Sequence, residues 1–214
     1  MRGKIPSFVR VKLLSDATFS RGEPAPGMVD IEVEHDKAGL PFIRGRTLRG
    51  LFRDSWLSMY PCFPALQEAA VRVLGKNRAL DESCRLRIGD ALLPRAVREA
   101  ARAAIERQVH PLSADEILRA LTTIRYQTAE ERESGAPAET TLRSSRVVLR
   151  GLYFDAPLEW LDGYLPRRDE LRVLALCALA TRHGGLTRNR GRGHVLVTLD
   201  GDLELTRSLA EEES

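Results

Sequence analysis

Two segments of the chain combine arginine with glycine in patterns suited to binding phosphate. The first, LPFIRGRTLRGLFR at residues 40–53, passes through Gly45 directly into the expected start of a helix. Free backbone amides and the positive end of a helix make such a turn an anion site. Arg46, Arg49 and Arg53 are spaced three and four apart, which predicts one shared helix face. A basic face above free amides suits a phosphate backbone, although an ordinary helix with a solvated basic face has the same residues.

The second segment is GGLTRNRGRGH at residues 184–194. Arg188, Arg190 and Arg192 alternate along it, so an extended backbone would point all three side chains the same way. Its four glycines allow a close approach to a ligand and positive φ angles. A flexible basic loop is the alternative for this segment alone. Because each segment joins a sheet to a helix, we expect the two to fold together into a cradle for ribose-phosphate.

Composition leaves the nucleic-acid hypothesis open. The formal net charge is only +3, but four of the 33 basic residues are lysines, which leaves 29 arginines. Arginine binds phosphate through two parallel hydrogen bonds and stacks on bases. A genome rich in GC also favours arginine codons, so the positions of the arginines have to decide between the two explanations.

Several functional classes find no support in the sequence. No apolar run is long enough to span a membrane, and the first residues lack the apolar stretch of a signal peptide, so we expect a cytoplasmic protein without a membrane partner. The three cysteines, at positions 62, 84 and 177, are far apart and form no CxxC pair, which favours reduced thiols over disulfides or a zinc site. The sequence has no P-loop, dinucleotide fingerprint or nucleophile elbow.

The hydrophobic pattern predicts an α+β fold. The chain length of 214 residues fits one domain with an insertion. Alternation predicts strands over residues 8–14, 85–93, 146–154 and 194–199, and a β-prone run lies at residues 28–34. The turn Asp200-Gly201 is expected to lead into a further strand over residues 202–205.

Helices are expected between these strands. Thr47 is the expected N-cap of the first, which prolines 61 and 64 stop, and others cover residues 65–74 and 95–109. Ser113 and Glu116 form a capping box for a short helix, and Asp169 is expected to cap a helix over residues 170–182. Residues 122–141 predict a protruding hairpin with a polar tip at 130–139. The order β-α-β, β-α-β is that of a ferredoxin-like (RRM-like) βαββαβ core.

At these residues the sequence resembles the RAMP superfamily, and more closely the guide-RNA-binding backbone subunit of type III CRISPR effector complexes. The family motif L-P-[YF]-I-P-G-[ST]-[ST]-L-K-G is similar to LPFIRGRTLRG at residues 40–50. Its glycine-rich loop, G-G-x-x-x-R-G-x-G-x-V, is matched by residues 184–185 and by RGRGHV at residues 190–195. Its second-strand motif resembles RIGDA at residues 87–91, and its thumb hairpin resembles residues 124–128 with 142–154.

The resemblance implies one RAMP domain over residues 1–214, with an insertion at about 94–145 that includes the thumb hairpin at about 122–145. Guide RNA is then expected to lie across the first helix start and the glycine-rich loop, with the thumb intercalating between guide segments. Complementary target RNA, other effector-complex subunits and neighbouring copies or homologous RAMP subunits are the implied partners. The implied RNA-binding residues are Arg44, Gly45, Arg46, Thr47, Arg49, Arg53, Tyr126, Thr128, Arg143, Arg188, Arg190, Gly191, Arg192 and Gly193.

The resemblance also implies a catalytic residue, Asp30. In active backbone subunits an aspartate in the pattern [AV]-[IV]-D, six residues before a second aspartate, cleaves the paired target RNA. Met28-Val29-Asp30 matches this pattern, with Asp36 six residues further on. Such a carboxylate can accept the proton of an attacking 2′-hydroxyl or hold a divalent ion, so Asp30 is also the implied ligand of Mg²⁺ or another divalent cation.

The chain departs from the family pattern at three places. Arg44 replaces a proline, Arg46 replaces a small hydroxyl residue, and Arg125 stands where the thumb usually has an aspartate. Two alternatives therefore remain: a non-catalytic RAMP subunit that serves as a structural cap, and a guide-processing endonuclease that uses His35 as its general base.

Overall fold

A four-stranded antiparallel sheet forms the centre of the molecule, in the order β2–β5–β1–β6. The computed structural model describes residues 4–20, 22, 29–76, 83–127, 143–188 and 190–211. The strands are β1 (Phe8–Leu13), β2 (Leu86–Ile88), β5 (Tyr153–Trp160) and β6 (Val195–Leu199). Helices connect β1 to β2 and β5 to β6, strands that are not neighbours in the sheet. This order and the antiparallel pairing confirm the predicted ferredoxin-like core.

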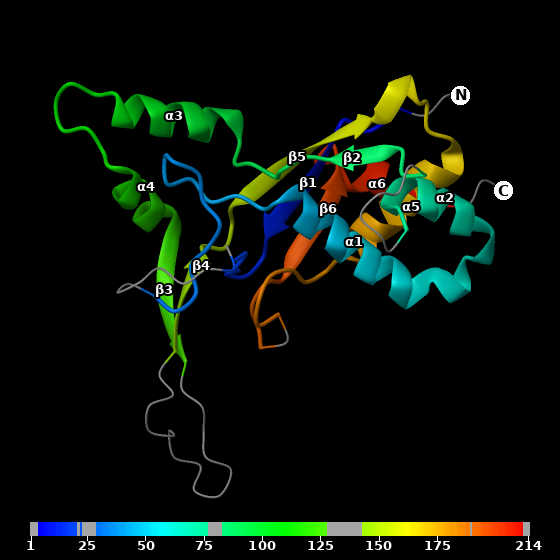
Figure 1. The fold of residues 1–214 in the computed structure, drawn as a ribbon, viewed down its shortest axis with the longest axis horizontal. Coiled ribbons are helices and arrows are strands. Elements are labelled where there is room, and N and C mark those ends of the chain that lie inside the picture. Colours follow the sequence, from blue (N-terminus) through cyan, green and yellow to red (C-terminus); the bar gives the residue numbers. More distant parts are fainter. Residues whose placement is uncertain are drawn as a thin grey trace, which may run out of the picture.

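Helices cover one face of this sheet (Figure 1). Strand β1 alternates as expected: Val9, Val11 and Leu13 are buried. They join one hydrophobic core with α1 (Gly45–Met59) and α5 (Arg168–Ala180). The α5 residues that the sequence assigned to the core, at positions 173, 174, 177 and 178, are all buried. None of the helices in the described ranges is long and apolar enough to pass through a bilayer.

The insertion extends from one end of the sheet, away from α2 (Gln67–Leu74) (Figure 1). It contains α3 (Arg95–Ile105), α4 (Ala114–Leu121) and the hairpin of β3 (Thr122–Gln127) with β4 (Arg143–Val148), a separate two-stranded sheet. The capping box at the start of α4 is confirmed, because Ser113 N–H donates to Glu116 and Ser113 Oγ accepts from the N–H of Glu116. The expected hairpin tip lies outside the described residues.

Four predicted boundaries are wrong. The strand expected over residues 146–154 is two strands, β4 and β5, because the chain turns at Gly151 with a φ of 89°. The strand expected at 85–93 is regular only in β2 and continues as single bridges. The helix expected to reach residue 109 ends at Ile105. Asp169 lies inside the first turn of α5, whose N-cap is Arg167.

The C-terminal strand expected over residues 202–205 is also wrong. The turn itself is present, since Asp200 and Gly201 have φ angles of 51° and 71°. Beyond it the chain forms α6 (Leu203–Ala210), whose first turn Asp202 caps by accepting the N–H of Leu205 at 3.0 Å. The helix packs on α5 and buries Leu209, and a two-residue turn motif cannot predict this contact.

Candidate nucleic-acid interface

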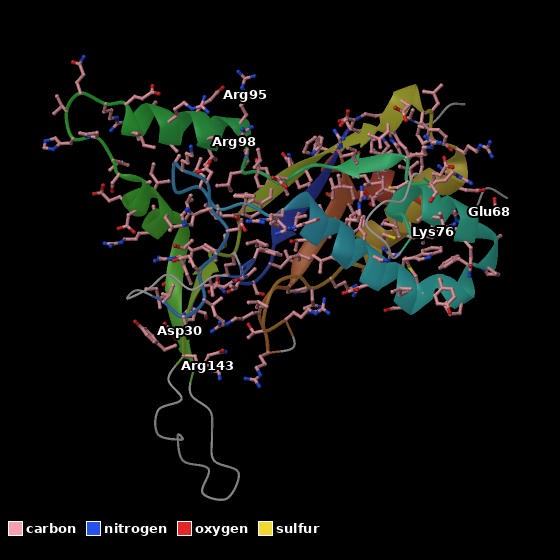
Figure 2. The ribbon with its side chains drawn as sticks, viewed as in Figure 1. Asp30, Glu68, Lys76, Arg95, Arg98 and Arg143 are labelled. Carbon is pink, nitrogen blue, oxygen red and sulfur yellow. The ribbon has the colours of Figure 1, made fainter. Side chains whose placement is uncertain are left out.

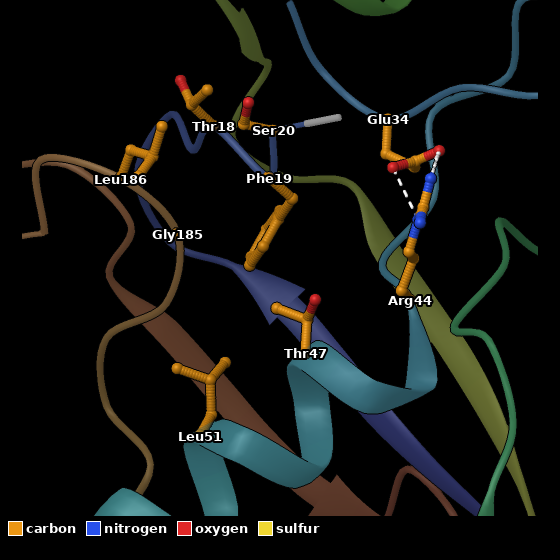
Figure 3. A pocket seen from close by; sticks show the side chains of 9 residues that line it. All are labelled: Thr18, Phe19, Ser20, Glu34, Arg44, Thr47, Leu51, Gly185 and Leu186. Carbon is orange, nitrogen blue, oxygen red and sulfur yellow. Dashed lines mark hydrogen bonds and ion pairs between the residues drawn. The ribbon is translucent and has the colours of Figure 1, made fainter. Parts of the chain in front are cut away.

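The two arginine–glycine segments meet in space. A Cβ atom added to Gly184 would lie 3.0 Å from the side chain of Leu51 on α1. Arg188 reaches Asp54 on the same helix, with 3.6 Å between Nη2 and Oδ2. A cavity of about 270 Å³ lies between the segments, where Thr47 and Leu51 face the loop at Gly185 (Figure 3). The expected proximity of the two segments is therefore confirmed, while RNA binding by them stays a prediction.

The start of α1 already holds an anion from the protein itself. The N–H of Gly45 donates to Oδ1 of Asp90 at 2.8 Å, and the N-cap is Arg44 rather than Thr47. Glycine is required here, since a Cβ atom would lie 2.2 Å from the carbonyl oxygen of Ile88. The prediction of an open anion site at this helix start is thus wrong, because a carboxylate from the loop after β2 occupies it.

The arginines of the first segment do not form one open face. Arg44 makes a bidentate ion pair with the buried Glu34, with both N···O distances at 2.7 Å (Figure 3). Arg49 donates to the carbonyl of Leu86, and Arg53 donates to the carbonyls of residues 75 and 76, just beyond α2. Arg46 is the exposed arginine of this segment. The predicted basic face is therefore reduced largely to Arg46.

The glycine-rich loop folds back on itself instead of running extended. Thr187 has a φ of 56°, and the N–H of Arg190 donates to its carbonyl at 2.9 Å, so the expected common direction of the loop arginines is wrong. Gly193 has a φ of 70°, and a Cβ atom there would lie 2.0 Å from the carbonyl oxygen of Gly184. Arg192 instead points to the β3–β4 hairpin and donates to Ser145 Oγ at 3.0 Å.

A second cavity, of about 540 Å³, opens where the glycine-rich loop meets the base of the hairpin. Three arginines from separate segments line it, namely Arg125 on β3, Arg150 after β4 and Arg192, together with one acid, Asp16. Burial would raise the pKa of Asp16, but the guanidinium of Arg125 at 2.8 Å and the N–H of Arg150 at 3.1 Å hold that pKa below its ordinary value. Three guanidinium groups against one carboxylate suit a phosphodiester.

Sequence reasoning missed this cavity. Arg150 and Asp16 carry no motif, and Arg125 was noted only as a departure from the family pattern. The cavity arises because antiparallel pairing sets Arg125 directly opposite Ser145, the residue that Arg192 contacts. This cross-strand register brings Arg125 and Arg192 together although they are distant in the sequence.

Asp30 lies against the same hairpin, near the end of the β3–β4 ladder that is farthest from α4 and close to Arg143 (Figure 2). Its Oδ2 accepts the N–H of Ser144 at 2.6 Å and the hydroxyl of Ser144 at 3.0 Å, and its own N–H donates to that hydroxyl oxygen at 3.0 Å. The hydrogen bond from the N–H of Ser144 has the largest effect on the pKa of the Asp30 carboxyl, and the one from its hydroxyl comes next. Together they hold that pKa below its ordinary value. Asp30 is exposed, so an ionised carboxylate faces solvent beside Ser144.

The segment that carries Asp30 runs along β4. Ile31 exchanges backbone hydrogen bonds with residues 144 and 146, at 3.2 and 2.9 Å. Next to it, Glu32 and Arg146 form a buried ion pair at 2.9 Å, with 6% and 3% of their side chains exposed. The β-prone run expected at residues 28–34 is therefore an edge segment of bridges rather than a regular strand, and Met28 lies outside the described residues.

The other acidic residues expected near the site have structural roles. Oδ1 of Asp36 accepts the N–H groups of Ala38 at 2.9 Å and Leu40 at 3.0 Å, which closes a turn. His35 Nδ1 lies 3.0 Å from the carbonyl oxygen of Asp36. Within the described ranges, no three His, Cys, Asp or Glu side chains are placed to share a metal ion. Asp30 could hold Mg²⁺ together with phosphates of a bound RNA, a mode that Mg²⁺ often uses.

The hairpin has two chemically different faces. Side chains alternate along a strand, and cross-strand partners share a face. Tyr126 pairs with Ser144, so this exposed tyrosine shares the face of Asp30. Arg125 pairs with Ser145 on the opposite face, where the arginine cavity lies. The position of Thr128 lies outside the described residues.

Comparisons with known proteins agree with this architecture. The model of the RAMP superfamily matches residues 10–195. A chain of the type III-B Cmr-beta complex in its apo state, solved by cryo-EM, superposes with a TM-score of 0.66 at 13% identity, covering 93% of this chain and 98% of that chain. A chain of the Cmr-beta complex bound to cognate target RNA gives a TM-score of 0.67 at 11% identity, covering 95% and 100%. The search of curated proteins found no match.

Proposed function

The chain belongs to the RAMP superfamily, and from that premise we propose that it is a guide-RNA-binding backbone subunit of a type III CRISPR effector complex that cleaves paired target RNA through Asp30. The observation that carries the proposal is the placement of two chemically different groups along the β3–β4 hairpin. There a cavity with three arginines lies on one face and an ionised carboxylate on the other. The superposed Cmr-beta chains come from complexes of this type, one of them bound to target RNA.

Guide binding would use the arginine cavity and the exposed residues around it. Guanidinium groups bind phosphate in a planar, bidentate geometry and do not read base sequence. Arg46 on α1 and Arg190, next to Gly191 of the cavity, are also exposed. Such a surface predicts an affinity that falls steeply with salt and depends little on the sequence of the guide.

Target cleavage would take place on the opposite face. The 2′-oxygen of a target ribose attacks the adjacent phosphorus, the bond from phosphorus to the 5′-oxygen breaks, and the 5′-oxygen takes up a proton from solvent. The carboxylate of Asp30 can accept the hydrogen of the attacking 2′-hydroxyl and so orient it for attack. A divalent cation held between Asp30 and the target phosphates would neutralise charge that develops on the phosphate.

The test is target cleavage by the reconstituted effector complex, with Mg²⁺ and a matched guide. Asp30→Asn removes the charge but keeps an oxygen that can accept the N–H of Ser144, so the local fold should persist. We expect this variant to bind guide and target as the wild type does and to lose cleavage. Normal cleavage by Asp30→Asn would establish the second candidate, a structural subunit without catalysis.

That second candidate has its own supporting observation. In the described part of the chain, Asp30 does not belong to a cluster of three or more acidic, histidine or cysteine side chains that could share a metal ion. For a guide-processing endonuclease built on His35, a hydrogen bond from Nδ1 to the carbonyl oxygen of Asp36 would leave Nε2 as the base. If the chain binds guides without processing them, His35→Ala should leave the processing of a guide precursor unchanged.

A further inference from the structure

The side chain of Ser144 closes a ring with Asp30. Its hydroxyl donates to Oδ2 of Asp30 at 3.0 Å and accepts the N–H of Asp30 at 3.0 Å, while its own N–H donates to the same Oδ2 at 2.6 Å. One hydroxyl thus uses both its donor and its acceptor on a single residue. All three contacts join residues that are 114 positions apart in the chain.

We propose that Ser144 is the positioning residue of the cleavage site, fixing the Asp30 carboxylate through Oδ2 so that Oδ1 faces the target RNA. This inference rests on the proposed function, because it assigns Ser144 a role only if Asp30 cleaves. Each oxygen of a carboxylate can accept more than one hydrogen bond. The structure uses Oδ2 for Ser144, which leaves Oδ1 for the target.

The surroundings explain why a dedicated positioning residue is needed. Asp30 is exposed and lies outside any regular strand, so packing does not fix its rotamer. The backbone that follows it is held separately, through Ile31 and the buried pair of Glu32 with Arg146, and neither contact touches the carboxylate. The hydrogen bonds of Ser144 fix the orientation of the Asp30 side chain relative to this anchored backbone.

The position of Ser144 also suits the substrate. Strand β4 carries it on the face where its cross-strand partner Tyr126 is 64% exposed. An exposed aromatic ring beside the carboxylate offers a surface on which an unpaired base can stack. A nucleotide stacked there would lie on the hairpin face where Ser144 holds Oδ2 of Asp30.

The test compares Ser144→Ala and Ser144→Thr in the reconstituted complex under single-turnover conditions. Alanine removes the hydroxyl but keeps the backbone N–H, whereas threonine keeps the hydroxyl and is well suited to a strand. We expect Ser144→Ala to lower the cleavage rate constant by roughly ten- to a hundredfold, because a misplaced catalytic group costs that much. Target affinity should be unchanged, and Ser144→Thr should restore most of the rate.

Controls separate this idea from the proposed function. Ser208→Ala removes a hydroxyl that donates to Leu205 on α6 and should change neither the rate nor the affinity. If Asp30→Asn cleaves normally, the proposed function fails whatever Ser144 does. If Asp30→Asn is inactive and Ser144→Ala cleaves at the wild-type rate, the positioning role alone is refuted. Loss of target affinity in Ser144→Ala, or an equal loss of rate in Ser144→Thr, would also overturn the positioning role, because the serine would then only support the hairpin.

Discussion

Alanine at position 193 should destabilise the protein more than alanine at position 191, although both glycines lie in the same loop with positive φ. The φ angles are 70° at Gly193 and 77° at Gly191. A Cβ atom on residue 193 would lie 2.0 Å from the carbonyl oxygen of Gly184, whereas nothing lies within 4 Å of one on residue 191. The two substitutions therefore share a conformational cost and differ in a steric one.

The magnitudes follow from the contacts. A left-handed conformation costs an L-residue about 1 kcal/mol, which is the full expected effect of Gly191→Ala. At residue 193 the chain must also move away from Gly184. That movement breaks the hydrogen bond from Gly184 N–H to the carbonyl of Gly193, at 2.8 Å, and the one from Gly193 N–H to the carbonyl of Asp16, at 2.9 Å. At about 1 kcal/mol for each bond, Gly193→Ala should cost about 3 kcal/mol.

Thermal unfolding of the purified variants measures this difference. In a chain of this size a loss of 1 kcal/mol of stability lowers Tm by about 2–4 °C. The Tm of Gly191→Ala should therefore fall by about that amount, and the Tm of Gly193→Ala by about 6–12 °C. Guide affinity, measured in parallel, should fall more for Gly193→Ala, since the loop holds Arg192 at the cavity. Equal Tm values for the two variants would refute the argument that close packing of Gly193 on Gly184 holds the loop.

Two further predictions concern acid stability and the arginines of α1. Burial disfavours ionisation of Asp200, but hydrogen bonds from Ser7 and Lys4 hold its pKa below the ordinary value. Its stabilising effect is thus present above the unfolded pKa of about 4 and lost as pH falls through the lower folded pKa. Asp200→Asn should weaken the acid dependence of urea unfolding below about pH 4; an unchanged dependence would contradict this. For the arginines of α1, Arg46→Gln should reduce the slope of log guide affinity against log salt concentration by about one, without changing Tm. Arg49→Gln should lower Tm, because the side chain loses its hydrogen bond to the carbonyl of Leu86. The reverse pattern would show that Arg49 is the RNA contact.

Local patterns predicted the parts of the fold that depend on local physics. The alternation in β1 is a property of six consecutive residues, and Val9, Val11 and Leu13 are buried as expected. The capping box at Ser113 needs only residues three apart, and it is present. The first helix and the glycine-rich loop come together because the sheet order requires it, and the predicted β-α-β, β-α-β sequence already contained that order.

The errors come from partners that are distant in sequence. Thr47 has the right chemistry for an N-cap. However, Asp90 accepts the backbone N–H of Gly45, 45 residues earlier in the chain, and α1 therefore begins at Gly45. Asp200-Gly201 forms the expected turn, but burial of Leu209 against α5 favours a helix after it. In both cases a tertiary contact outweighs a local preference that is worth about 1 kcal/mol.

Arginine spacing alone cannot delimit the proposed RNA-binding surface. Arg44, Arg49 and Arg53 stand in the motif, yet each binds a carboxylate or carbonyl of the protein itself. A guanidinium engaged in this way must first lose its partner before it can bind phosphate, and that loss offsets much of what the phosphate contact contributes. The arginine cavity differs, because Asp16 can pair with Arg125 while the charge of the other two guanidinium groups remains uncompensated by a cavity acid. The cavity therefore carries an excess of positive charge where three segments meet, and we expect a ribose-phosphate strand to be held there rather than at the start of α1.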